Sequence, residues 1–176
     1  MAKKLLQIFV LIFLICFAHP VWAGPFNFGV GFELVDATNF DGDDFGWSFQ
    51  LGYEIKETKH WNIGLEVDLF NSVTDENDIN EYHYADSSCM VFDSQAIYVT
   101  ARPKNWFLHF KAGVVKADYK TATKDIDDTG LALGLSLVLG SGKLRLHLLD
   151  YQHYEIGGDR FNSISVSVAV LLYWPK

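Results

Sequence analysis

The side chains most able to do chemistry in this sequence are ionisable groups placed singly among small residues on one face of alternating segments. Four are acids and two are bases: Glu33, Glu54, Glu66, Asp68, Lys111 and Arg145. A buried charge is tolerated only when it is paired and hydrogen-bonded. If this face lines a narrow interior, the pattern predicts a network of ion pairs across it, with His109 and His147 beside the bases. The alternative is that each charge is separately hydrated.

Strands must position these charges, and the alternation of residue types predicts strands. Near the C-terminus, large apolar residues from Ile164 to Trp174 alternate with mostly small ones such as Ser163 and Ser165. A period of two is typical of a β-strand whose two faces meet different surroundings. Eight such segments are expected, at 26–34, 45–55, 61–69, about 90–102, 106–114, 131–139, about 144–154 and 163–174.

Two of these segments are irregular. The fourth has no single apolar parity. The seventh breaks its alternation at Leu148-Leu149. A β-bulge adds one residue to a strand and shifts the parity of everything after it, so a bulge is predicted there.

The placement of bulky and small residues predicts which face meets lipid. Along each strand, one set of alternate positions carries bulky apolar residues and the other set is rich in Gly, Ser and Ala. The small residues suit the tight interior of an eight-stranded barrel. Aromatic residues at segment ends resemble two interfacial girdles: Phe26, Trp61, Trp106 and Trp174 at one end, and Phe45, Trp47, Tyr151 and Tyr154 at the other. We expect an all-β, eight-stranded antiparallel up-and-down transmembrane β-barrel. A soluble lipocalin-like barrel, with its apolar face inside, is the structural competitor.

The N-terminus predicts export. Lys3 and Lys4 precede an apolar run, and Val21-Trp22-Ala23 offers small residues at the cleavage positions. We therefore expect a signal peptide over 1–23 and a single barrel domain over 24–176, in the outer membrane of a Gram-negative bacterium. Only Cys89 remains after cleavage, which excludes an intramolecular disulfide.

Composition argues against several classes of partner. The formal net charge is −8, so no basic stripe is available to neutralise the phosphates of a nucleic acid. The histidines show no short-spaced metal pattern, and no glycine-rich phosphate loop lies between a strand and a helix. We expect no metal and no cofactor.

The predicted connections alternate in length. Short turns are expected at 56–60, 103–105 and 140–143, and longer polar loops at 36–44, 71–88, 116–128 and 155–161. Long loops of outer-membrane barrels face the cell exterior. Loops on a rigid scaffold often carry function. Loops 71–88 and 116–128 are therefore the expected surface for an extracellular ligand.

Residues 148–166 carry a resemblance to a family. A Tyr-rich strand, a Gly/Asp turn and an alternating last strand resemble the last hairpin of small outer-membrane barrels of the OmpA/OmpX type, the opacity-like porin family. The resemblance implies a monomeric eight-stranded barrel with a role in envelope integrity, adhesion or surface interaction. It also implies contact with outer-membrane lipid and lipopolysaccharide, and insertion by the barrel assembly machinery. Pro175 and Lys176 depart from the aromatic residue that usually ends these chains.

The sequence leaves two other functions open. His153-Tyr154-Glu155-Ile156 is similar to the His-Tyr-Ser-Asn segment of lipid A 3-O-deacylases, in which the histidine is a base and the serine a nucleophile. Here Glu155 replaces that serine, and Ser163 or Ser165 would have to approach His153 instead. A small pore would need an open lumen, and eight strands leave room only for side chains. A non-enzymatic structural or surface-interaction role is therefore the main prediction.

Overall fold

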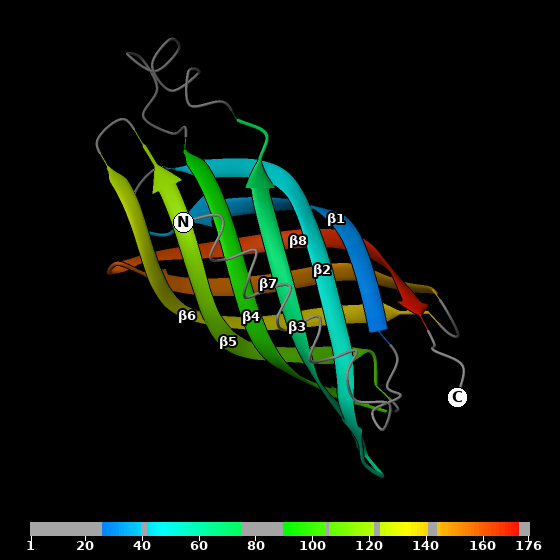
Figure 1. The fold of residues 1–176 in the computed structure, drawn as a ribbon. Coiled ribbons are helices and arrows are strands. Elements are labelled where there is room, and N and C mark those ends of the chain that lie inside the picture. Colours follow the sequence, from blue (N-terminus) through cyan, green and yellow to red (C-terminus); the bar gives the residue numbers. More distant parts are fainter. Residues whose placement is uncertain are drawn as a thin grey trace.

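A computed structural model describes residues 26–39, 42–74, 90–104, 106–121, 124–140 and 144–172. Eight antiparallel strands form one closed barrel in which each strand pairs with its sequence neighbours and β1 pairs with β8 (Figure 1). The strands are β1 (Phe26–Ala37), β2 (Asp43–Glu57), β3 (Trp61–Ser72), β4 (Val91–Pro103), β5 (Leu108–Lys120), β6 (Asp125–Leu139), β7 (Leu144–Ile156) and β8 (Asp159–Leu172). The predicted fold class is confirmed. The expected signal peptide, Trp174 and Cys89 lie outside the described residues. No described helix has the length and hydropathy to cross a membrane.

The two faces of the barrel wall differ as the alternation predicted. On β8, Val166 is 50% exposed, whereas Ser165 is 1% exposed. The same contrast holds on β1, where Phe32 is exposed and Glu33 is buried. Because the exposed positions form an apolar band, the wall is suited to lipid, and the closed ladder leaves no unpaired strand edge in it.

Both irregular segments have a structural reason. The pairing of β7 with β8 shifts between His147 and Asp150, so Leu148 and Leu149 both point outward. The predicted bulge is confirmed, and it turns Asp150 into the lumen. On β4 the lumen face carries Phe92 and Tyr98, both fully buried, which explains why large residues occupy both parities of that strand.

The barrel has two ends, which differ in their connections. The turn end carries connections 58–60, 104–107 and 140–143, and the loop end carries 38–42, 73–90, 121–124 and 157–158. The predicted loop 116–128 is wrong, because β5 and β6 continue through most of it as paired strands. The predicted loop 155–161 is also wrong. It is a two-residue turn of Gly157 and Gly158, whose φ angles of 60° and 90° suit glycine. Most of loop 71–88 lies outside the described residues.

The hairpin of β5 and β6 extends beyond the apolar band at the loop end. Val114 and Leu131 are 56% and 62% exposed, and they are the last apolar residues on the outward face of their strands. Beyond them, outward positions are polar or charged: Lys116, Asp118, Lys120, Asp125, Asp127 and Thr129. Residues 116–121 and 124–129, here called the loop-end hairpin, therefore form a paired wall that extends past the apolar band.

Apolar side chains fill the lumen toward the loop end. This lumen core consists of Val35, Ala37, Phe70, Met90, Phe92, Ala96, Tyr98, Val115, Ala117, Tyr119, Ala132, Tyr154, Ile156 and Phe161. Phe161 lies at its centre, with ring centroids 5.0 Å from Phe92 and 4.8 Å from Tyr119. Tyr154 was predicted to belong to an outward girdle. That prediction is wrong, because the side chain is 2% exposed and points inward.

Candidate functional site in the barrel lumen

Lys111 is the centre of a buried ionic cluster below the lumen core. It projects from β5, and its Nζ lies 2.5 Å from Glu66 Oε1, 3.0 Å from Asp68 Oδ2 and 2.6 Å from Asp150 Oδ2. None of these four residues is more than 6% exposed. One ammonium therefore holds three carboxylates from two other strands, so β3, β5 and β7 are joined across the lumen.

Amide and hydroxyl groups extend this cluster. Gln50 Nε2 donates to Asp150 Oδ2 at 2.9 Å, and Gln152 Nε2 donates to Asp68 Oδ2 at 3.3 Å. The hydroxyls of Tyr98 and Tyr154 both donate to Gln152 Oε1. These neutral groups share the excess negative charge of the cluster by hydrogen bonding, which is how a buried charge network becomes tolerable.

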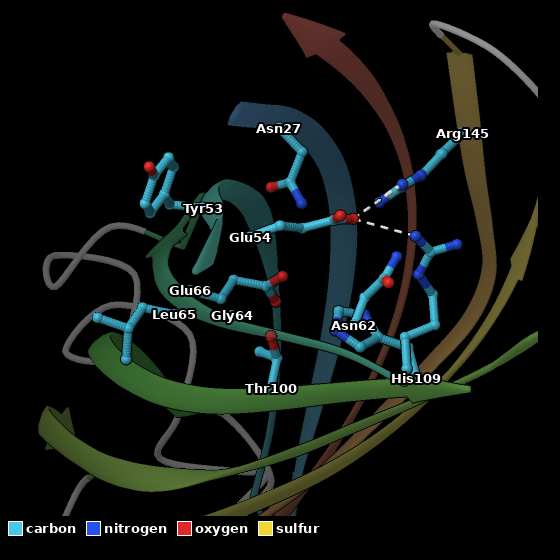
Figure 2. Close-up of a pocket in the computed structure, with 11 residues that line it drawn as sticks. Asn27, Tyr53, Glu54, Asn62, Gly64, Leu65, Glu66, Thr100, His109 and Arg145 are labelled. Atoms are coloured by element: carbon cyan, nitrogen blue, oxygen red, sulfur yellow. Dashed lines mark hydrogen bonds and ion pairs between the residues drawn. The ribbon is translucent and has the colours of Figure 1, made fainter. Parts of the chain in front are cut away.

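A second ionic layer lies nearer the turn end. Glu54 Oε1 accepts from Nη2 of Arg102 and of Arg145, at 3.0 Å in each case. Figure 2 shows the Glu54 carboxylate facing the Arg145 guanidinium group. The Arg102 guanidinium contacts the same carboxylate oxygen. Together with Asn27 and Asn62 they line a small cavity of about 10 Å³. This layer joins β2, β4 and β7, and all three charges are partly buried.

The structure brings together five of the six charged residues singled out from the sequence. Glu66 and Asp68 meet Lys111, and Glu54 meets Arg145. Glu33 is 3% exposed and lies instead beside the Tyr154 hydroxyl, at 3.5 Å. Sequence reasoning missed Asp150, whose direction depends on the bulge, and Arg102, which lies on the strand without a clear parity.

The two predicted inward histidines lie between the ionic layers. His109 and His147 are 7% and 2% exposed, with ring centroids 6.2 Å apart. His147 Nδ1 lies 3.2 Å from Ser136 Oγ. Within the described part of the chain, no group of three or more His, Cys, Asp and Glu residues is arranged to hold a metal ion.

Solved structures with the same architecture are known. No protein-family model matches the sequence, and no curated protein matches it either. The outer membrane protein OprG from Pseudomonas aeruginosa aligns with a TM-score of 0.53 and 12% identity, over 87% of this chain and 98% of that one. Ail, the attachment invasion locus protein of Yersinia pestis, in complex with the heparin analogue sucrose octasulfate, gives 0.52 and 14%, over 85% and 99%. This chain has the fold of the small eight-stranded outer-membrane β-barrels. At these identities the likeness concerns the fold alone.

In this barrel the serines proposed as partners of His153 lie on the opposite face of the wall. His153 points outward, with its side chain 31% exposed, and Nδ1 lies 2.8 Å from Asn162 Oδ1. Ser163 and Ser165 point into the lumen and are 1% exposed. A serine nucleophile from β8 therefore does not reach His153 in this structure.

We expect the Glu54–Arg145 contact to be measurable as an energetic coupling. Glu54→Gln and Arg145→Gln, made singly and together, should give a coupling free energy of about 1 kcal/mol, because the pair is in direct contact and mostly shielded from water. Urea unfolding in detergent micelles, followed by tryptophan fluorescence, measures it. The exposed pair Glu57–Lys104 at the same end is the control and should show no measurable coupling. Additive losses for Glu54 and Arg145 would contradict the pairing.

Lys124, Tyr119 and Asp159 form a cluster at the loop end, here called the latch, whose contribution to stability should depend on pH. Lys124 Nζ lies 2.8 Å from Asp159 Oδ2, and the Tyr119 hydroxyl donates to the same carboxylate. Burial raises the pKa of Asp159, but the hydrogen bonds from Lys124 and Tyr119 outweigh it and hold the pKa below its ordinary value of 3.8. The latch should therefore stabilise the barrel at neutral pH and lose that contribution as the pH falls below about 4. A carboxyl NMR titration should place the midpoint below 3.8, and Lys124→Met should raise it. An unchanged midpoint in that variant would exclude the latch.

Proposed function

We propose that this chain is exported behind the segment 1–23 and spans the outer membrane of a Gram-negative bacterium. There it acts as a non-enzymatic surface-interaction protein with the loop end outside the cell. The loop-end hairpin is the observation that carries this proposal. This hairpin extends beyond the apolar band and carries charged residues on its outward face, while side chains fill the lumen behind it. Insertion by the barrel assembly machinery and contact with lipopolysaccharide are part of the same proposal.

The charges of the loop-end hairpin indicate the chemistry of the partner. Asp118 of β5 is directly opposite Asp127 of β6 and Asp93 of β4, so three carboxylates form a row across the outward face. Lys116 pairs with Asp127, but Asp93 and Asp118 remain like charges directly opposite each other, which destabilises a sheet, so a further cation would stabilise the row. Partial burial and the nearby carboxylates raise the pKa of Asp118. The sequence places five further acids in the neighbouring loop: Asp75, Glu76, Asp78, Glu81 and Asp86.

A cationic protein surface is therefore the partner that this end of the barrel fits best. The Ail structure contains a polyanion, sucrose octasulfate. The acidic row of the present chain favours the opposite charge, because complementary potentials guide association and like charges oppose it. An adhesive role toward a basic target follows from this complementarity.

Binding of a polycation tests the proposal. A fluorescein-labelled oligolysine peptide should bind the barrel in neutral-lipid nanodiscs, with affinity that falls as salt rises. The triple variant Asp118→Asn, Asp125→Asn and Asp127→Asn should weaken binding at least about tenfold. Glu57→Gln at the turn end is the matched control and should leave binding unchanged. Tighter binding of sucrose octasulfate than of oligolysine would overturn the proposal.

The two alternative functions have direct tests of their own. We expect no conductance steps in planar bilayers, because the lumen core and the two ionic layers occupy the barrel interior. We also expect lipid A from cells with and without this protein to have the same acyl chains, with His153→Ala as the control. Conductance would favour the small pore, and an acyl chain lost in a His153-dependent manner would favour the hydrolase.

A further inference from the structure

We propose that the outward-facing group of Tyr151, His153 and Asn162, here called the wall patch, binds the sugar headgroup of a glycolipid in the adjacent membrane leaflet. The inference rests on the proposed membrane location but concerns a different surface from the loop-end hairpin. The wall patch lies on the outside of β7 and β8, where the barrel meets lipid.

Hydrogen bonds fix the geometry of the wall patch. Asn162 Oδ1 accepts from the Tyr151 hydroxyl at 2.8 Å and lies 2.8 Å from His153 Nδ1. Asn162 Nδ2 donates to Thr38 Oγ1 on the adjoining segment after β1, at 3.0 Å. One asparagine therefore orients an imidazole and a phenol on the outer wall, as three side chains from neighbouring strands lock one another in place.

The wall patch lies at the depth of apolar side chains. His153 is directly opposite Leu133, and Glu155, two residues nearer the loop end, is opposite Leu131. These leucines are 58% and 62% exposed, so the apolar band continues past His153 on the neighbouring strand. Hydrocarbon offers no hydrogen-bond partners, which makes an outward polar group at this depth costly unless a polar headgroup meets it.

The hydrogen-bond acceptors that the wall patch leaves unused suit a ligand with hydroxyl donors. Because His153 Nδ1 faces an amide oxygen, it carries the proton, and Nε2 keeps a lone pair. The Glu155 Oε1 atom lies 3.9 Å from Nε2, which is too far for a hydrogen bond between them. The Tyr151 oxygen also keeps its lone pairs once its proton is donated to Asn162. Two acceptors side by side on an exposed surface suit the hydroxyl groups of a sugar.

Nearby charges argue against an anionic headgroup. Arg160 is the cation closest in sequence to the wall patch, and its Nε lies 3.5 Å from Glu155 Oε1. Asp36, exposed on β1, is directly opposite Asn162. Because acceptors and carboxylates surround the position, a phosphate would be repelled there, whereas a neutral sugar would not.

Detergent titration tests the site in the intact barrel. Dodecyl maltoside is added to the protein in dodecylphosphocholine micelles, and the His153 imidazole resonances are followed by NMR. We expect a saturable shift. Asn162→Leu should weaken the apparent affinity at least tenfold. Asn71→Leu, an exposed asparagine on the outer face of β3, is the matched control and should stay within twofold of the parent. Both variants replace an outward polar group by an apolar one, and heat-modified gel mobility reports whether each is folded.

A maltose titration and an oligolysine binding measurement distinguish the possible outcomes. Free maltose, which lacks an alkyl chain, should give no saturable shift over the same range. If maltose saturates like the detergent, the site is a soluble-sugar site and the glycolipid assignment is overturned. An unmoved His153 in the parent protein also overturns it, whether or not Asn162→Leu folds. Oligolysine binding should be unchanged in Asn162→Leu, so failure here is distinguishable from failure of the proposed surface interaction.

Discussion

Replacing Lys111 by methionine is expected to lower the free energy of unfolding by about 3–5 kcal/mol, the usual loss when one partner of a buried ionic cluster is removed. The methionine keeps the apolar stem but leaves Glu66, Asp68 and Asp150 without a shared cation. Three carboxylates would then face one another in a lumen closed from water. Urea unfolding in micelles, followed by tryptophan fluorescence, measures the loss.

Two comparison variants make this result interpretable. Lys116→Met removes a cation from the half-exposed pair with Asp127 and should cost at most about 1 kcal/mol. Asp68→Asn and Asp150→Asn, added to Lys111→Met, should recover part of the loss, because the uncompensated charges are then gone. If Lys111→Met refolds with the stability of the parent, the carboxylates are hydrated separately and the ionic network does not hold the strands together.

Truncating Phe161 to alanine is expected to destabilise the barrel by about 3–5 kcal/mol, as large core truncations do. Phe161 is fully buried, and its ring lies against Phe92 and Tyr119 in the lumen core. These strands are tied into a closed ladder, so the wall can collapse only partly and a cavity remains. The urea midpoint should fall without a large change in slope.

Phe32→Ala is the control for this truncation. Phe32 lies on the outward face of β1 and is 46% exposed. Lipid chains or detergent can fill the space that its ring leaves, so we expect a clearly smaller loss than for Phe161. Equal losses at the two positions would mean that the lumen core packs no more tightly than the lipid-facing surface.

The alternation of residue types was sufficient to predict the barrel and most of its inward charges. Glu66 and Lys111 could be assigned to the lumen because their strands alternate without interruption. Asp150 and Arg102 could not be assigned. One follows the bulge at Leu148-Leu149, and the other lies on β4, where large residues occupy both faces. Alternation cannot assign a residue to a face of the wall after a bulge, which adds a residue to the strand, or on a strand with large residues on both faces.

The loop predictions failed for a related reason. Residues 116–128 are polar, and polarity suggested a loop, but β5 and β6 stay paired there with Ala117 and Tyr119 buried on the inner face. Beyond the lipid boundary an outward strand face can be charged, because water and not hydrocarbon lies against it. A strand whose outward face meets water therefore has apolar residues only on its buried face, and its sequence resembles that of a polar loop.

The sequence by itself determined the strand number, the closed fold and most of the charges that face inward, because a period of two and a lipid-facing surface leave little freedom. Only the tertiary structure decided which charges meet. Register and strand shear place Lys111 among three carboxylates and Glu54 between two arginines, and they leave Glu33 beside a tyrosine. These partners are 39 to 121 residues apart along the chain, from Lys111 and Asp150 at the lower end to Glu33 and Tyr154 at the upper. Local pattern carries no information about contacts made across a barrel.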